Sequence, residues 1–115
     1  VNIADEDGNT PLHWASSHGY VYSTEKLLRN GADPNKKNNV GSTALLKVAS
    51  TNDQYVVEEI MDLLIEYGAD INIVDLSGDT PLNHASVGGV VCAARKLLRN
   101  KADPNQKNNK GVTAL

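Results

Sequence analysis

The sequence has very little of the chemistry that cross-links secreted proteins or carries a chain across a membrane. Its 115 residues include one cysteine, Cys92, which excludes an internal disulfide and fits a reducing compartment. No apolar run approaches the ~20 residues that a membrane-spanning helix needs. The most apolar stretch, 87–94, is short and contains Gly88 and Gly89. No charged start precedes an apolar signal core either. We therefore expect an intracellular protein, cytoplasmic or nuclear, without a membrane partner.

Signatures of catalysis and cofactor binding are also missing from the sequence. His13 and His18 are five residues apart, which suits neither the i, i+4 pair of a helical zinc site nor a pairing with Cys92. The third histidine, His84, stands alone. No glycine-rich phosphate loop, nucleophile elbow or aspartate-rich calcium loop is present. The sequence therefore predicts a non-enzyme with no catalytic residues, no bound metal and no cofactor.

What the sequence does contain is one short pattern that recurs at a nearly fixed interval. A glycine, any residue, threonine, proline or alanine, and leucine follow one another at 8–12, 41–45, 78–82 and 111–115. Successive glycines are 33, 37 and 33 residues apart, a period typical of stacked repeats. The sequence also shows a second, longer period. Residues 8–45 agree with residues 78–115 at 24 of 38 positions, which indicates that a pair of repeats was duplicated.

Thr-Pro-Leu-His at residues 10–13, followed by Gly-Ala-Asp-Pro-Asn at 31–35, resembles the ankyrin-repeat family, and the resemblance covers the whole chain. It implies a mainly α fold, a solenoid of stacked helix–turn–helix units with β-hairpin loops. Three full repeats with partial repeats at both ends indicate a piece of a longer array, which we expect to be monomeric in isolation. The expected division is 1–4 (end of a preceding repeat), 5–37, 38–74 and 75–107 (repeats one to three), and 108–115 (start of a further repeat).

The first repeat shows why each unit is expected to fold as two helices. Thr10 can cap a first helix over 12–17, and Pro11 suits its first turn because a missing N–H costs nothing there. A second helix is expected over 21–29, ending at an Asn-Gly stop signal. The resemblance implies side-chain braces at the first turn, formed by Thr10 with His13 and by Thr80 with Asn83, while Leu46 leaves repeat two without one.

Repeat two differs from its neighbours in length and in apolar content. Its four extra residues fall around 51–55, where we expect a longer loop between the helices that could be shortened without unfolding the chain. Its second helix is rich in large apolar residues. Ile60 and Met61 stand where the neighbouring repeats have small residues at 23–24 and 93–94, so we expect the central helix to fill space that its neighbours leave.

Charge is unevenly distributed along the chain. Residues 1–40 carry a net charge of −1, 41–77 of −6 and 78–115 of +4. The basic third repeat is open to two interpretations, an anion-binding stripe or ion pairs between stacked repeats. We favour ion pairs because Arg29, Glu66 and Arg99 come into register on the second helices. No aromatic residues are interleaved for base stacking, and we expect no nucleic-acid partner.

In ankyrin arrays, partners usually meet the hairpin tips and the exposed part of each first helix. One further row holds Trp14, Lys47 and His84, at a position that is usually apolar. Trp14 is equally expected to fill the core between repeats. The ammonium group of Lys47, in contrast, must reach the groove or pair with a carboxylate. The candidate partner-binding residues are Asp7, Asn9, Trp14, His18, Val40, Ser42, Lys47, Leu76, Ser77, Asp79 and His84.

We accordingly expect a non-catalytic module that binds a partner protein, of unknown identity, through this concave surface. The alternative is a structural or intramolecular role as a spacer or brace within a larger multidomain protein. The resemblance adds one candidate modification, hydroxylation of the hairpin asparagine Asn72.

Overall fold

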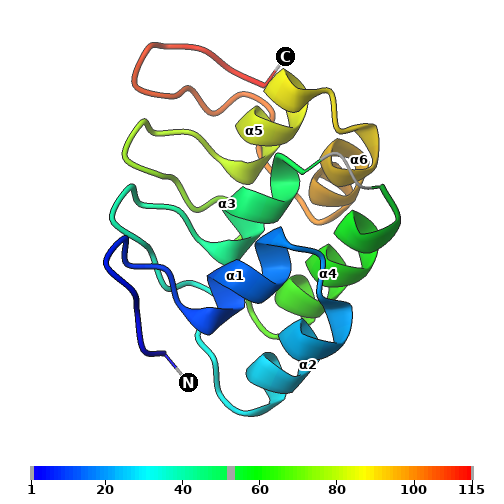
Figure 1. Ribbon diagram of the computed structural model, residues 1–115. Helices are drawn as coiled ribbons and strands as arrows, with labels where there is room; N and C mark the ends of the chain where they lie inside the picture. Colours follow the sequence, from blue (N-terminus) through cyan, green and yellow to red (C-terminus); the bar gives the residue numbers. More distant parts are fainter. Residues whose placement is uncertain (1, 52–53, 115) are drawn as a thin grey trace.

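The computed structural model describes residues 2–51 and 54–114, and these form six helices arranged as three stacked pairs (Figure 1). The first helices of the pairs, α1, α3 and α5, lie side by side in one layer. The second helices, α2, α4 and α6, form the other layer, and long loops project from the first layer. The bounds are α1 Pro11–Ser17, α2 Val21–Arg29, α3 Ala44–Ala49, α4 Gln54–Glu66, α5 Pro81–Gly88 and α6 Val91–Arg99.

This arrangement confirms the mainly α solenoid predicted from the sequence. The second helix of repeat one has the predicted bounds, and the first begins one residue earlier than expected. No strand is assigned within the described residues, so the expected β-hairpin loops are present as successions of turns. None of the helices in this part of the chain is long and apolar enough to cross a membrane.

Each first helix starts at a threonine in extended conformation. The Thr10 hydroxyl accepts the backbone N–H of His13, and the His13 side chain accepts the backbone N–H of Thr10, which satisfies two donors at the helix end. Thr80 and Asn83 form the same reciprocal pair. In repeat two Thr43 still caps α3, but its partner is the backbone of Leu46, whose side chain cannot bond in return. The predicted braces and their loss are both confirmed.

The core lies between the two helix layers and runs through all three repeats. Each first helix contributes a buried leucine after the threonine cap, and each second helix contributes another. The central helix α4 contributes most, with side chains that have almost no exposed surface. These core residues include Leu12, Leu28, Leu45, Ile60, Met61, Leu64, Leu82 and Leu97.

The extra residues of repeat two lengthen a helix, which corrects the expectation of a longer loop. Helix α4 has 13 residues, whereas α2 and α6 have 9 each, a difference of four. Val57 aligns with Tyr20 and Val90, which only precede their helices, yet it lies inside α4 and is 1% exposed. Residues 52–53 of the predicted loop lie outside the described residues. Because the extra residues form the first turn of α4 rather than a loop, we no longer expect their deletion to be harmless.

The ion pairs also differ from the predicted register. Arg29 pairs with Glu25 at 2.8 Å one turn away on its own helix, rather than with the next repeat. Between repeats, Lys96 of α6 donates to the carboxylate of Asp62 on α4 at 2.6 Å. No pair among the described residues joins Arg29, Glu66 and Arg99. Exposed pairs of this kind stabilise a fold by only ~0–1 kcal/mol.

His13 joins repeat one to repeat two in a single protonation state. Its Nδ1 accepts the N–H of Thr10 at 2.9 Å, so the ring proton stands on Nε2 and is donated to the carbonyl oxygen of Ser42 at 2.9 Å. Burial lowers the pKa of the His13 imidazole below its usual 6.5.

Stability should therefore fall as the pH drops below about 6.5, because the unfolded chain then binds a proton that the folded chain resists. At higher pH the neutral ring is present in both states and this loss disappears. His13→Asn copies the brace of Asn83 without a titrating ring. The free energy of unfolding of the original chain, measured by urea titration from pH 7.5 to 5.5, should decline relative to that of His13→Asn. Parallel curves would show that His13 does not titrate in this way.

Lys101 is the one described non-glycine residue with positive φ, at +70°. It aligns with Gly31 and Gly68, where an added Cβ would meet nothing within 4 Å. The strain at Lys101 is thus in its backbone rather than in crowding.

Lys101→Gly should raise the free energy of unfolding by about 0.5–1 kcal/mol, since the cost of the left-handed conformation exceeds the added flexibility of glycine. Thermal and urea unfolding measure the change. Lys107→Gly is the matched control, because Lys107 is equally exposed and has no positive φ. A control variant that gained as much stability would contradict the explanation.

Candidate recognition surface

The four loop tips share one hydrogen-bonding design. At the first tip, Oδ1 of Asp5 accepts the backbone N–H groups of Asp7 and Asn9, both at 2.9 Å. An Asp or Asn side chain that accepts backbone N–H groups in this way holds the turn in place. The same pair of bonds recurs at Asn38, Asp75 and Asn108.

Successive tips are tied together through their backbones. Asn39 donates to the carbonyl oxygen of Asp7 at 2.9 Å, Leu76 to that of Val40 at 3.2 Å, and Asn109 to that of Ser77 at 3.0 Å. The approach is so close that a Cβ on Gly41, which has φ of +78°, would lie 2.8 Å from the amide nitrogen of Leu76. The tips therefore form a continuous ridge, named here the tip ridge, along one side of the molecule (Figure 1).

Two members of the predicted row are anchored to the tips of their own repeats. The indole Nε1–H of Trp14 donates to Oδ2 of Asp5 at 3.0 Å, and Nε2–H of His84 donates to Oδ2 of Asp75 at 2.8 Å. The Trp14 bond lowers the pKa of the Asp5 carboxyl below its usual value. Trp14 is 51% exposed, so its alternative role as core filler is wrong.

Lys47, the third member of the row, is half-buried and has no carboxylate partner among the described residues. It lines a cavity of about 30 Å³ with His13 and Trp14 on α1, so its side chain lies in the groove between α1 and α3. In this repeat the residue that aligns with Asp5 and Asp75 is Asn38. Its amide does not pair with Lys47 but donates to Oδ1 of Asn9 at 2.9 Å. The middle of the row therefore presents a half-buried cation without a partner among these residues.

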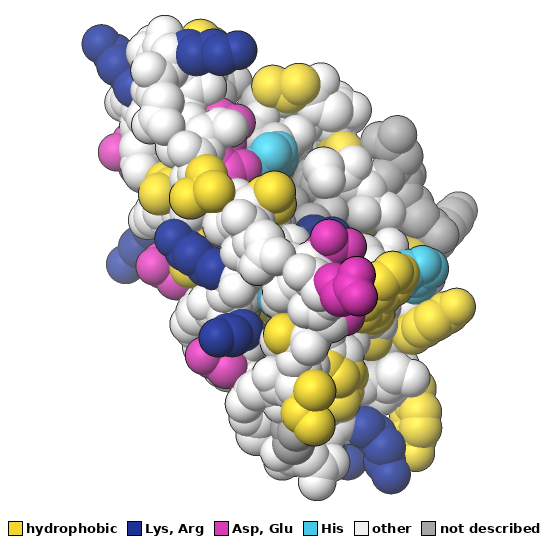
Figure 2. Space-filling model, turned by 60° about the vertical axis from the view of Figure 1, so that its left-hand side comes forward, with side chains coloured by type: hydrophobic (Ala, Val, Ile, Leu, Met, Phe, Trp, Pro, Cys, Tyr) yellow, Lys and Arg dark blue, Asp and Glu magenta, His cyan; other side chains and the backbone are white. Residues whose placement is uncertain are grey.

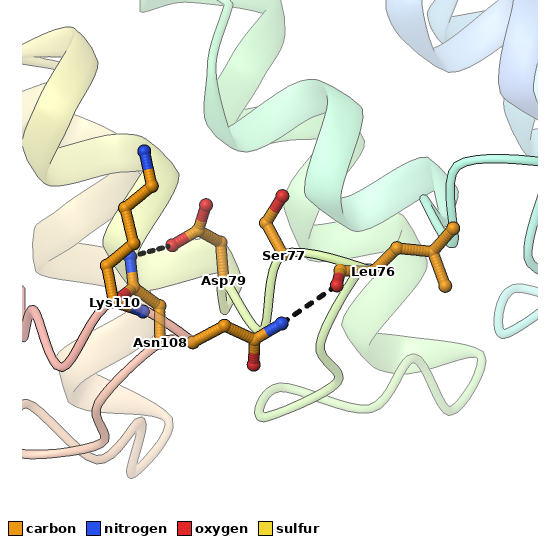
Figure 3. Close-up of a pocket in the computed structure, with 6 residues that line it drawn as sticks. Leu76, Ser77, Asp79, Asn108 and Lys110 are labelled. Carbon is orange, nitrogen blue, oxygen red and sulfur yellow. Dashed lines mark hydrogen bonds between the residues drawn. The ribbon is translucent and has the colours of Figure 1, made fainter.

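A hollow on the tip ridge lies between the last two tips and has a volume of about 310 Å³. Asn108 donates to Asp79 at 2.8 Å across this hollow, and Figure 3 shows Ser77, Asp79 and Lys110 extending to the same side while Leu76 points away. Asn108 was missed by the sequence reasoning, although its alignment with Asn38 could have indicated it. The full lining is Leu76, Ser77, Asp79, Asn108, Asn109 and Lys110.

His18 lies away from the tip ridge, at the far end of α1. Its ring stacks on Trp14 with centroids 5.3 Å apart and on Tyr20 at 5.7 Å. The sequence reasoning did not foresee this exposed stack, because Tyr20 follows the helix break. His18 thus extends the surface of Trp14 toward α2 rather than joining the tips.

The other predicted residues, Asp7, Asn9, Val40 and Ser42, lie on the first two tips. The side chain of Val40 is 63% exposed and that of Leu76 is 71% exposed, and neither belongs to the core. Figure 2 shows the tip side of the molecule brought forward, with acidic, basic and apolar side chains interleaved. The surface is therefore mixed in chemistry, as protein-binding surfaces commonly are.

Asn72 is exposed and forms a bond to the following repeat, in which its Oδ1 accepts the N–H of Asp103 at 3.2 Å. The aligned Asn35 forms two such bonds, donating to Gly68 at 3.0 Å and accepting from Asp70 at 2.7 Å. Hydroxylation of Asn72 stays a prediction.

Comparisons with known proteins agree with this architecture. A family model described as ankyrin repeats in three copies matches residues 21–108. The chain is 36% identical over 107 residues to the palmitoyltransferase AKR1 of Lachancea kluyveri, covering 92% of this chain and 14% of that protein. It is 38% identical over 138 residues to the putative ankyrin repeat protein L86 of Acanthamoeba polyphaga mimivirus (100% and 24%). It is also 38% identical over 116 residues to the neurogenic locus notch homolog protein 1 of Mus musculus (100% and 4%). The chain thus spans a quarter or less of these relatives.

The asparagine bonds give a ranking of stabilities. Asn35→Ala should lower the free energy of unfolding by about 1–2 kcal/mol and Asn72→Ala by about 0.5–1 kcal/mol, because the first loses two bonds between repeats and the second loses one. Urea unfolding of the two variants makes the comparison. Equal losses, or the reverse order, would show that these bonds do not stabilise the stack.

Proposed function

Since the chain belongs to the ankyrin-repeat family, we propose that it binds a partner protein through the tip ridge and the exposed parts of α1, α3 and α5. Ankyrin repeats are generally non-catalytic modules of protein–protein interaction. The observation that carries the proposal is that, in the loops, the groups that hold the tips differ from the side chains that face outward. Backbone groups and Asp or Asn side chains, those of Asn39 and Asn109 among them, hold the tips, while the outward side chains of Val40 and Leu76 take no part in the frame.

That division explains how such a surface becomes specific. Exposed tip residues whose side chains form none of these bonds, such as Val40 and Leu76, can change without disturbing the spacing of the tips, so their identities are free to match a partner. Val40 and Leu76 are exposed apolar side chains on adjacent tips, joined by a backbone bond. Together they supply a rigid apolar contact whose geometry is fixed before binding, which reduces the entropy lost on association.

Lys47 supplies the complementary polar contact. Its side chain lies in the groove between α1 and α3, and the other two members of the row, Trp14 and His84, are already oriented by their own tips. A half-buried cation gains more from a partner carboxylate than an exposed one, because water screens it less. The proposed partner segment is thus apolar where it meets the tips and acidic where it meets Lys47.

The second candidate is a role as spacer or brace within a larger protein. It is favoured by the relatives, in which the matching region is 4–24% of the length, and by the one that is named an enzyme. In that case the tip ridge would contact another part of the same polypeptide. Binding of the isolated module to a separate protein distinguishes the two candidates.

The test begins with affinity capture by this chain and mass spectrometry, followed by titration with the purified partner. Lys47→Ala combined with Leu76→Ala should weaken binding at least tenfold, since anchors at the centre of an interface commonly contribute ~2 kcal/mol or more. The melting curve should stay nearly unchanged, because both side chains lie outside the core.

Glu58→Ala combined with Arg95→Ala is the matched control, since both residues are exposed on the second-helix layer. It should leave affinity close to that of the original chain. A larger loss from this pair than from the Lys47 and Leu76 pair would move the binding surface to the outer helices and contradict the assignment.

A further inference from the structure

The third repeat brings two carboxylates and an imidazole together at the base of its tip. Nε2 of His84, on α5, lies 2.8 Å from Oδ2 of Asp75. One possible ligand atom from each of Asp75, Asp79 and His84 lies within 4.8 Å of the other two. The side chains of His84 and Asp75 are 32% and 14% exposed. We propose that Asp75, Asp79 and His84 form a binding site for a divalent transition metal ion, with Zn²⁺ as the best match.

The donor set suits this ion. Zn²⁺ binds imidazole nitrogen and carboxylate oxygen at about 2.0–2.2 Å, and a site with three protein ligands completes its coordination with water. Two ligand atoms of a tetrahedral Zn²⁺ lie about 3.3–3.6 Å apart. A pair of donor atoms at the 4.8 Å limit would therefore need to approach by about 1.2–1.5 Å, a movement on the scale of a side-chain rotation. His84 would present the lone pair of Nε2, and its ring proton would move to Nδ1.

Repeat one shows that the fold does not need these chemical types. There the aligned residues are Asp5, Asn9 and Trp14, and they form two corresponding side-chain contacts. Trp14 donates to Asp5 as His84 donates to Asp75. The amide of Asn9 accepts at 2.9 Å from Asn38, as the carboxylate of Asp79 accepts at 2.8 Å from Asn108. Two neutral, non-ligating side chains thus build the same tip.

What repeat three adds is negative charge and a metal-binding nitrogen at one point. Among the described residues, no lysine or arginine lies within ion-pair distance of Asp75 or Asp79. A divalent cation would balance the charge of both carboxylates and bind the imidazole nitrogen.

An ion can also reach the site. Asp79 lines the hollow of about 310 Å³ between the last two tips, which opens on the tip ridge (Figure 3). Among the described residues no hydrogen bond reaches Oδ2 of Asp79, since Asn108 donates to Oδ1. One oxygen of Asp79 is therefore available as a ligand without breaking the bond between the tips.

The experiment titrates the whole chain with Zn²⁺ by calorimetry and with Co²⁺ by visible absorption, which reports nitrogen and oxygen ligation directly. We expect one equivalent to bind, and Zn²⁺ to raise the melting temperature. The test variant combines Asp79→Asn with His84→Trp and so reproduces the contacts of repeat one. It should bind at least tenfold more weakly, while its melting temperature without metal stays close to that of the original chain.

His18→Ala is the matched control, because His18 is the exposed histidine outside the cluster, and it should leave binding unchanged. If the double variant does not fold, Asp79→Asn alone serves, since it keeps an acceptor for Asn108. Absence of binding by the original chain would overturn the proposal. Undiminished binding by the folded variant, or loss of binding in His18→Ala, would overturn it as well.

Discussion

The packing of α4 between α2 and α6 is the contact on which the rest of the structure depends. A single helix pair cannot bury its apolar surface, so each repeat is stable only through its neighbours. Ile60 and Met61 on α4 are almost fully buried, and the aligned positions on the neighbouring helices hold small residues such as Thr24 and Ala93, which are also buried. Large side chains in the centre thus fill the space left by small ones on either side, as the sequence predicts. Each large side chain contributes roughly 1.5–3 kcal/mol through burial.

The spacing set by this core determines the geometry of the tip ridge. Once the helix layers are stacked, each loop lies close enough to donate a backbone N–H to the loop before it, and Gly41 shows how little room is left at that distance. His13 and Asn35 bridge repeats one and two and fix their spacing at α1 and at the loop that follows the second helix. The spacing between the exposed side chains of the tip ridge is therefore set by the packing of the helices in the core.

Much of this could be predicted from the sequence, because the signals concerned are local. The caps at Thr10 and Thr80 and the second helix of repeat one depend on residues within a few positions of one another. The extra turn of α4 could not be predicted in the same way, because the aligned residues Tyr20 and Val90 precede their helices and do not indicate that the helix of repeat two begins earlier. Side-chain partners across the stack were least predictable. Arg29 had an alternative partner one turn away on its own helix, and Lys96, not Arg99, reached the neighbouring repeat.

The candidate surface was located by alignment, but its contacts depend on loop geometry. Asp5 and Trp14 are nine residues apart, and only the turn that brings the tip back over α1 lets the indole reach the carboxylate. The same bond joins Asp75 to His84, whereas in the intervening repeat Asn38 reaches the preceding tip instead. Asn108 repeats the behaviour of Asn38.

The tips thus alternate with a period of two repeats, the same unit that the 70-residue offset in the sequence indicates. Within each unit, the Asp side chain of one tip bonds to the first helix of its own repeat, and the Asn side chain of the next tip bonds to the tip before it. The two copies of this pair keep the same bonds although two of their side chains differ. Trp14 and Asn9 in one copy are replaced by His84 and Asp79 in the other. Differences between the copies at these two positions therefore alter the exposed chemistry of the ridge without altering the bonds that hold it.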